Sequence, residues 1–572
     1  MKKIFDTLTT PYSDKMDREL PHNEYPRTSM VRDSFFCLNG EWQFSVFLGE
    51  ECENTKITVP FPPESTLSGY GKAIPEGAVM KYERRFTLPE GFVRSRVILH
   101  FGAVDTLAEV FINGSSVIKH KGGYLPFSLD ITDFISVDCE NRISVTVRDD
   151  LDKKYPYGKQ KRNRGGMWYT PVSGIWQTVW LESVPENYIE RLKITGDMKG
   201  ATIRVFGAKG IKKRLVLDGA SYEFSEDEIR IEPEKINLWS PENPYIYDFD
   251  LYAGEDKVSS YFALREIGSS TFDGIPRLTL NGLPYLFNGL LDQGYFPDGI
   301  FLPATSEGYK EDILRTKSLG FNTLRKHIKI EPEIFYTLCD RLGIVVFQDM
   351  VNNSSYSFFF DTVLPTIGVK RLPDCHKHPS RESRRIFTEH SLSTLEHLHN
   401  FPSVLYYTVF NEGWGQFSAD KMYKIIKDAD PTRIVDATSG WFTRHESDVD
   451  SRHVYFKRVK LRGTPKRPLV ISEFGGYSHR VSGHLFGSAN YGYKQFENKD
   501  EFENAFLTLY GEEILPLIKR GVSALIYTQL SDVEDETNGL ITYDRRVIKI
   551  NEKRARSVMQ RLSAQIENGE EN

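Results

Sequence analysis

Residues 404–415 read Val-Leu-Tyr-Tyr-Thr-Val-Phe-Asn-Glu-Gly-Trp-Gly. The first seven carry no charge and are apolar, β-branched or aromatic, which is typical of a strand that is buried on both faces of a parallel sheet. Helical patterns flank this run at about 381–399 and 419–428. A buried strand between two helices is the repeating unit of α/β folds, so this stretch predicts such a fold.

The same alternation of strand and helix extends from about residue 270 to the C-terminus. Eight strand-like runs occur there, the number that closes a (β/α)8 TIM barrel. We therefore expect residues 269–572 to form this barrel. The strand-like runs lie at 286–289, 321–325, 344–349, 404–410, 433–437, 452–456, 469–472 and 522–527, and helical patterns lie at 308–319, 333–342, 381–399, 419–428, 502–519 and 552–566.

The residues before the barrel carry strand patterns with few helical ones. Short alternating or aromatic runs between turn signals, such as 41–46 and 108–112, recur through residues 1–185 and predict a jelly-roll β-sandwich. Shorter runs over 186–268 fit an immunoglobulin-like β-sandwich. The sequence thus predicts a multidomain chain in which two β-sandwiches precede the barrel.

Charge and cysteine content exclude several classes of function. The net charge is −6, which gives no footprint for binding nucleic acid or an anionic membrane. No run reaches the about 20 apolar residues of a membrane helix. The five cysteines are widely spaced without a Cys-x-x-Cys pair, which disfavours structural zinc and a disulfide framework. Since no apolar signal segment follows the first residues, we expect a cytoplasmic protein.

Two glutamates stand where predicted barrel strands end. Glu412 follows the fourth strand and Glu473 the seventh, and glycines follow both. Catalytic groups of such barrels lie at the carboxyl ends of the strands, and two carboxyl groups about 5–5.5 Å apart perform retaining glycoside hydrolysis. A single glutamate at a strand end is more often an ion-pair or capping residue. The pair at one barrel face favours catalysis.

Several motifs resemble glycoside hydrolase family 2, which contains β-galactosidases, β-glucuronidases and β-mannosidases, and the resemblance covers nearly the whole chain. In the first predicted domain the runs Leu38-Asn39-Gly40-Glu41-Trp42-Gln43-Phe44 and Gly174-Ile175-Trp176-Gln177 are similar to the family's sugar-binding jelly roll. In the barrel the similar motifs are Gly320-Phe321-Asn322-Thr323-Leu324-Arg325, Asn411-Glu412 and Ser472-Glu473-Phe474-Gly475.

The resemblance implies roles for four residues. Glu412 matches the family's general acid/base and Glu473 its nucleophile. Asn411 would bond the sugar 2-hydroxyl, in contacts that strengthen in the transition state. Arg325 would steady the nucleophile, although a structural ion pair is compatible with this role. No metal ligand maps onto the sequence, so the expected site contains neither metal nor cofactor.

Further candidate substrate contacts are weaker. After strand two the family's proline is absent and its histidine stands one position early, so His327 is either a substrate contact or a satisfied core histidine. Two aspartates end strands one and three and would bond sugar hydroxyls or cap turns, and two tryptophans near strand ends could stack on a sugar. A tyrosine stands near the place of the family's last-strand tryptophan. These candidates are Asp292, Asp349, Trp414, Trp441 and Tyr527.

The stretch after strand eight bears on the substrate. Glucuronidases carry an Asn-x-Lys motif there, whereas this chain has Glu536 and Asn538, and an acidic group would repel a uronate. We therefore expect a terminal β-linked neutral sugar, most plausibly a β-galactoside, in an oligosaccharide or glycoside, and a possible homo-oligomer. β-Glucuronidase and β-mannosidase activity remain alternatives. So does a carbohydrate-binding protein with a silent barrel, against which the two intact glutamates argue. The basic loop 159–164 is interpreted as a solvated face rather than as part of the barrel mouth.

Overall fold

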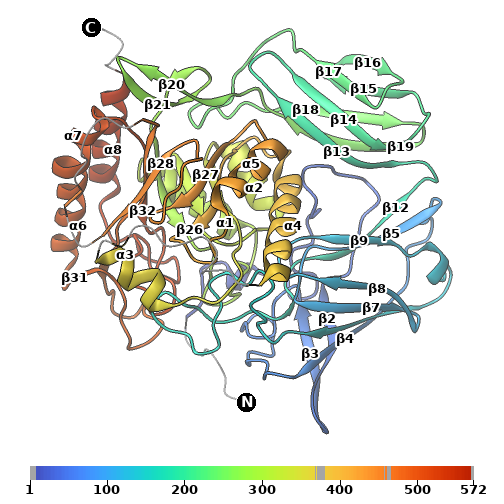
Figure 1. Cartoon of the computed structure of the whole chain (residues 1–572). Coiled ribbons are helices and arrows are strands. Elements are labelled where there is room, and N and C mark those ends of the chain that lie inside the picture. Colours follow the sequence, from blue (N-terminus) through green and yellow to red (C-terminus); the bar gives the residue numbers. More distant parts are fainter. Residues whose placement is uncertain (1–7, 368, 370–379, 456–457, 460–465, 568–572) are drawn as a thin grey trace.

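The computed structural model describes residues 8–367, 369, 380–455, 458–459 and 466–567. A central barrel lies beside two sandwiches built from the N-terminal half of the chain (Figure 1). The expected fold class, a jelly-roll sandwich and an immunoglobulin-like sandwich followed by a TIM barrel, is confirmed. The domain boundaries given above stay predictions. Cys375, one of the five cysteines, lies outside the described residues, and the other four are free thiols.

The barrel is one eight-stranded parallel sheet in the order β27-β26-β25-β24-β23-β32-β29-β28. Each predicted strand run overlaps one of these strands. All eight residues of β26 are buried, as its uncharged sequence predicts. The strands are β23 (Phe287–Asp292), β24 (Thr323–Lys326), β25 (Val345–Asp349), β26 (Val404–Asn411), β27 (Ile434–Ser439), β28 (Asp450–Val454), β29 (Leu469–Gly475) and β32 (Val522–Thr528).

One of the predicted helices around the barrel is interrupted. The helical pattern at 502–519 is divided by a π-helical turn, and a proline at position 516 opens the last segment, since proline lacks the N–H that continues a helix. Residues 440–449 between β27 and β28 form no helix. The helices are α1 (Glu307–Ser318), α2 (Glu333–Leu342), α3 (Leu364–Thr366), α4 (Arg381–Leu398), α5 (Ala419–Ala429), α6 (Lys499–Thr508), η4 (Leu509–Ile514), α7 (Leu515–Ile518) and α8 (Glu552–Glu567).

The first sandwich packs a four-stranded antiparallel sheet, β1-β12-β5-β9, against a six-stranded one, β3-β2-β4-β10-β7-β8. Alternate residues of β2 are buried, Trp42, Phe44 and Val46 among them, because successive side chains of a strand point to opposite faces. The strands are β1 (Phe36–Cys37), β2 (Gly40–Leu48), β3 (Glu51–Val59), β4 (Val79–Phe86), β5 (Arg96–Phe101), β7 (Leu107–Ile112), β8 (Ser115–Lys121), β9 (Phe127–Asp130), β10 (Asn141–Arg148) and β12 (Val179–Val184), with the pair β6 (Val104–Asp105) and β11 (Gly174–Ile175).

The second sandwich has sheets β13-β14-β17 and β16-β15-β18-β19, and the three-stranded sheet β20-β21-β22 precedes the barrel. Trp239 ties this region to the barrel, since its buried indole N–H donates to the carbonyl of Asp340 in α2 at 2.8 Å. The strands are β13 (Ile189–Gly196), β14 (Ala201–Gly207), β15 (Lys213–Leu217), β16 (Ala220–Phe224), β17 (Glu228–Ile231), β18 (Tyr247–Ala253), β19 (Asp256–Phe262), β20 (Ile267–Phe272), β21 (Ile275–Leu280) and β22 (Leu283–Pro284).

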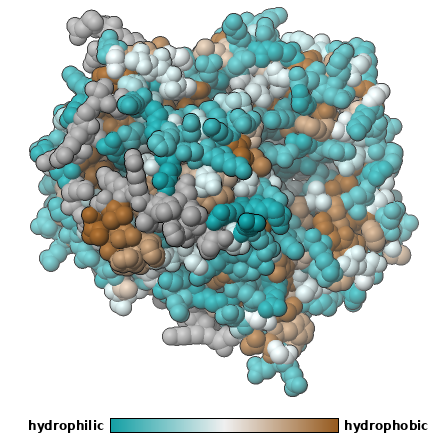
Figure 2. Space-filling model, in the orientation of Figure 1, coloured by the Kyte–Doolittle hydropathy of each residue, from teal (hydrophilic) through white to brown (hydrophobic). Residues whose placement is uncertain are grey.

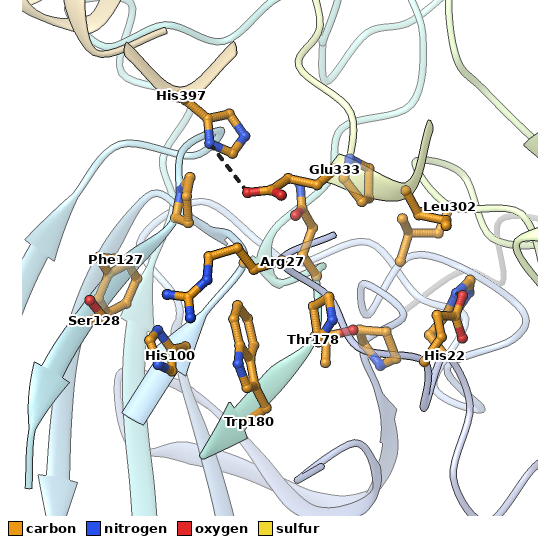
Figure 3. Close-up of a pocket in the computed structure, with 18 of the residues that line it drawn as sticks. His22, Arg27, His100, Phe127, Ser128, Thr178, Trp180, Leu302, Glu333 and His397 are labelled. Carbon is orange, nitrogen blue, oxygen red and sulfur yellow. Dashed lines mark ion pairs between the residues drawn. The ribbon is translucent and has the colours of Figure 1, made fainter. Parts of the chain in front are cut away.

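Two further features of the surface stand out. An apolar patch around α3 (Figure 2) contains Phe358, Phe359 and Phe360, which are 66%, 55% and 48% exposed. A cavity of about 170 Å³ opens where the first sandwich meets α2 and α4, with Arg27, His100 and Trp180 among its lining (Figure 3). Among the described helices, none combines the length and apolarity needed to cross a bilayer.

Candidate active site

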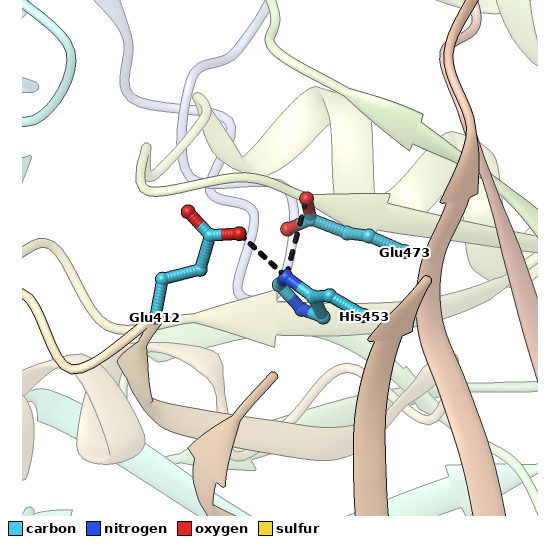
Figure 4. Close-up of side chains that lie close together, drawn as sticks. All are labelled: Glu412, His453 and Glu473. Carbon is cyan, nitrogen blue, oxygen red and sulfur yellow. Dashed lines mark hydrogen bonds and ion pairs between the residues drawn. The ribbon is translucent and has the colours of Figure 1, made fainter. Parts of the chain in front are cut away.

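The two glutamates lie at the carboxyl end of the barrel and face each other. Glu473 belongs to β29, and Glu412 directly follows β26. One oxygen of each carboxylate and a ring nitrogen of His453 all lie within 4.8 Å of one another (Figure 4). Glu412 has a φ of 51°, a conformation that non-glycine residues rarely adopt and that is concentrated at functional sites. Both carboxylates are therefore close enough to contact one small ligand group.

Glu473 is held as a carboxylate. Its Oε1 accepts from Arg325 Nη1 at 3.1 Å and its Oε2 from the hydroxyl of Tyr455 at 2.6 Å. Burial by itself raises the pKa of Glu473, but the positive charges of His453 and Arg325 together with the Tyr455 hydrogen bond outweigh burial, so the pKa is lowered from its ordinary value. An ionised carboxylate is the form that can attack an anomeric carbon.

Arg325 donates hydrogen bonds to several other buried residues of the site. It is 1% exposed, and its guanidinium donates to Asp349 Oδ1, to the carbonyl of Ser472 and to Asn411 Oδ1, each at 2.9 Å, in addition to Glu473. Five donors in a fixed fork allow one arginine to orient all these groups. Asn411 is thereby fixed beside the nucleophile, with its amide N–H group left over for a ligand.

Asp349 and His327 form a second layer behind Arg325. Asp349 Oδ2 lies 2.7 Å from His327 Nδ1. Burial raises the pKa of Asp349, but the Arg325 charge and the His327 contact prevail and lower it to about 2. Burial lowers the pKa of His327. Both residues therefore act on Glu473 through the position of Arg325, which Asp349 contacts directly.

Glu412 has a different environment. Its side chain is 18% exposed, against 7% for Glu473, and the ring nitrogen Nδ1 of His453 lies 2.8 Å from Glu412 Oε1. A glycine is required at position 413, where φ is 72° and a Cβ would lie 2.2 Å from the ring of Phe442. Two carboxyl groups with unequal surroundings are the arrangement that separates an acid/base from a nucleophile.

Two residues of this site, His453 and Tyr455, are not among the residues predicted from the sequence. They stand at the end of the sixth strand, whose weak pattern was recognised as a strand only. The signal that would have found them is the position rule already applied to the glutamates, since polar side chains at the carboxyl end of any barrel strand are candidates. Trp441, a predicted contact, packs its ring against His453 at 5.4 Å between centroids.

Three candidates have side chains held in other contacts. Asp292 is 5% exposed and pairs with Lys326 at 2.5 Å, within a buried ion network. Trp414 is 3% exposed and packs edge to face on Trp168 of the first sandwich, which leaves little of its ring for a sugar. Tyr527 is fully buried against Phe474 and Phe506, on the side of the strand that faces the helices.

The basic loop of the first sandwich reaches the barrel, contrary to the expected solvated face. Arg164 lies 3.4 Å from Glu534 and 3.5 Å from Asp535, in the segment after β32. The neighbouring Tyr169 hydroxyl donates to Glu536. Burial raises the pKa of Glu536 and lowers the pKa of His327. The charge of Lys159 is near both groups and lowers both pKa values by a smaller amount. The first sandwich therefore forms part of the barrel mouth.

Glu412, His453 and Glu473 are also the one group of at least three potential metal ligands within the described ranges. Two ligands of one zinc ion at about 2 Å each lie about 3.3 Å apart in a tetrahedral site. The distance of 2.8 Å between His453 Nδ1 and Glu412 Oε1 is a hydrogen-bond distance instead. This contact is therefore shorter than the separation of two tetrahedral zinc ligands.

Two sandwiches followed by a parallel barrel with two facing carboxylates define the class of protein, a multidomain (β/α)8-barrel protein. The sugar-binding-domain model of glycosyl hydrolases family 2 matches residues 72–185, and the TIM-barrel-domain model of the same family matches residues 303–567. The chain belongs to glycosyl hydrolase family 2.

Similar proteins agree with this membership. A β-galactosidase of Leuconostoc mesenteroides is 23% identical over 91% of this chain and 51% of its own length, and one of Thermoanaerobacter pseudethanolicus is 26% identical over 55% of this chain and 44% of its own. The chain thus spans about half the length of the curated relatives it matches. A solved β-D-glucuronidase of Dictyoglomus thermophilum has the same fold, with a TM-score of 0.73 and 17% identity over 94% of this chain and 98% of that one.

Proposed function

We propose that this protein is a retaining β-glycosidase that removes a terminal β-linked sugar by double displacement. The observation that carries the proposal is the pair Glu412 and Glu473, whose carboxylate oxygens lie within 4.8 Å in unlike environments. Glu473 attacks the anomeric carbon while Glu412 protonates the leaving oxygen. Glu412 then removes a proton from the water that releases the sugar from Glu473.

Asn411 and Arg325 support this chemistry. The Asn411 carbonyl is held by Arg325 at 2.9 Å, so the amide N–H group points away from the arginine and can bond the sugar 2-hydroxyl. Arg325 keeps Glu473 charged and oriented for attack. Both roles rest on hydrogen bonds that the buried guanidinium makes at the same time.

The substrate we propose is a neutral sugar, first of all a β-galactoside. Burial raises the pKa of Glu536, and the nearby charge of Glu473 raises it further. An acidic group at this position disfavours a uronate. A β-glucuronide is the second candidate, because Lys159 places a cation near His327 and Glu536. The curated relatives are named β-galactosidases, and the solved neighbours are β-glucuronidases and β-galacturonidases, so all three sugars belong in the first assay. A cytoplasmic location and a homo-oligomer stay predictions.

The test is hydrolysis of a panel of nitrophenyl β-glycosides: galactoside, glucuronide, galacturonide, mannoside and glucoside. We expect release of nitrophenol with the galactoside, loss of turnover to background in Glu473→Ala, and first release of the β anomer of the sugar in NMR spectra. A deoxyfluoro sugar with a dinitrophenyl leaving group should add one glycosyl mass to the peptide that contains Glu473.

The matched control is Glu503→Gln. Glu503 is a buried glutamate of α6, and it pairs with Arg554 of α8 rather than with a residue of the site. Turnover of any glycoside that persists in Glu473→Ala contradicts the proposal. Binding of sugars without turnover in the wild-type protein would favour the carbohydrate-binding alternative.

A further inference from the structure

His453 of β28 stands between the two glutamates and has no assigned role. Its Nδ1 lies 2.8 Å from Glu412 Oε1 and 3.5 Å from Glu473 Oε2, and Figure 4 shows the ring below both carboxylates. The side chain is fully buried. A buried imidazole against two carboxylates controls where protons reside in the site.

A chain of hydroxyl groups on the other side of the ring determines which nitrogen carries a hydrogen. Ser472 Oγ lies 3.3 Å from the carbonyl of Arg452 and 2.7 Å from Ser451 Oγ, and its hydrogen goes to one of these two. Ser439 Oγ therefore donates to Ser472 Oγ at 3.0 Å. A hydroxyl has one hydrogen, so Ser439 has none left for the ring. With Ser439 donating to Ser472, we assign His453 Nε2, 2.8 Å from Ser439 Oγ, as the donor of that contact.

This direction has a consequence at Nδ1. A neutral imidazole with its hydrogen on Nε2 presents a bare lone pair at Nδ1. A carboxylate oxygen and a bare lone pair repel each other at 2.8 Å, so a proton must lie between Nδ1 and Glu412 Oε1. We propose that His453 and Glu412 share one proton, and that His453 is the positioning residue that supplies the general acid with it.

The shared proton fits both halves of the proposed reaction, on which this inference rests. In the first half the proton moves to the glycosidic oxygen as its bond to the anomeric carbon breaks and a Glu473 oxygen bonds that carbon. The Glu412 carboxylate now faces the bare Nδ1. In the second half water bonds the anomeric carbon, the bond to Glu473 breaks, and the proton of water restores the shared pair.

The residues after β27 pack closely against the ring. Gly440 has a φ of 91°, and a Cβ there would lie 2.8 Å from the His453 ring. The edge of Trp441 closes another side of the ring. The backbone after β27 thus fixes the ring at the distance that proton sharing requires.

Two substitutions of His453 each keep one of the two hydrogen-bonding contacts of its ring. In His453→Asn the amide takes the place of Nδ1 and can bond Glu412, but it holds no transferable proton. In His453→Gln the amide takes the place of Nε2 and keeps the contact with Ser439. We expect both variants to lose about 10–100-fold of kcat/KM on a phenyl glycoside and less than about 3-fold on the dinitrophenyl glycoside, whose departure needs little protonation. Ser391→Ala, which removes a buried hydroxyl bonded only within α4, is the control for substitution of a buried polar residue.

Equal losses on the two glycosides would show a structural role and overturn the inference. Rescue of phenyl glycoside hydrolysis by His453→Asn would show that a plain hydrogen-bond donor suffices, which also overturns it. A second measurement needs no activity: in protein labelled with nitrogen-15 histidine, the His453 signals, identified by their loss in His453→Gln, should show hydrogen on Nε2. A bare Nε2 refutes the shared proton. Absence of all turnover in the wild type would instead refute the proposed function and leave this measurement valid.

Discussion

Replacing Tyr455 by phenylalanine removes one hydroxyl group and leaves its ring in place. The hydroxyl donates to Glu473 Oε2 at 2.6 Å and lies 2.8 Å from Thr528 Oγ1, while the ring stacks on Tyr493 at 4.0 Å. A hydrogen bond to a charged group contributes about 1.5–3 kcal/mol. If Glu473 is the nucleophile, the loss of this bond should lower kcat/KM for the best nitrophenyl glycoside by about 10–150-fold.

The pH dependence of kcat/KM shows whether the pKa of Glu473 rises in Tyr455→Phe. Tyr455 is one of the groups that lower the pKa of Glu473, so its removal should raise that pKa. Because attack needs the ionised carboxylate, the acidic limb of the kcat/KM profile should move to higher pH in Tyr455→Phe. The assay is a series of initial rates over pH for the wild type, Tyr455→Phe and the control Tyr407→Phe, whose hydroxyl contacts Asp430 at 3.4 Å outside the site. An unchanged acidic limb together with a loss below about 3-fold would refute this role for the hydrogen bond.

Three further outcomes follow from the buried charges and from the orientation of one strand residue. Arg325→Met should lower the free energy of unfolding in urea by about 3–5 kcal/mol, because it leaves two buried carboxylates without their partner; a loss below about 1 kcal/mol would contradict this. The pKa of Asp349 is lowered from 3.8 to about 2, so its charge stabilises the fold above about pH 4, and about 2 kcal/mol is lost as the pH falls toward 2. Asp349→Asn should therefore show a shallower loss of stability over that interval, as measured by urea unfolding at each pH, and an unchanged slope would count against it. Tyr527→Phe should keep kcat/KM unchanged, since its ring packs against Phe474 and Phe506, and a marked rise in KM would restore it as a substrate contact.

The ends of the predicted strands were enough to find the two glutamates, but not the residues that contact them. Glu412 and Glu473 each follow a long apolar run, so the sequence shows both the strand and its end. The sixth strand is short and mixed in character, and its sequence does not show which side chains point inward. For that reason His453 and Tyr455 were recognised only after the tertiary structure placed them beside Glu473.

Tyr527 illustrates a limit of the same kind. It stands at the expected height of the eighth strand, but successive residues of a strand point to opposite faces. Its neighbour Thr528 contacts Tyr455 at 2.8 Å, whereas the ring of Tyr527 points toward α6. A shift of one residue in the inferred register exchanges the two faces, and no pattern in a strand buried on both sides reveals that register.

The sequence by itself determined the architecture and the two carboxylates, because hydrophobic periodicity and position along the strand are local properties of the chain. Only the tertiary structure decided what surrounds those carboxylates: the guanidinium that keeps Glu473 charged, the imidazole beside Glu412, and the loop of the first sandwich at the barrel mouth. These contacts join residues far apart in sequence, and their distances depend on how strands and domains pack. Charge and proton affinity at the site depend on such distances, so they follow from the fold and not from the order of residues alone.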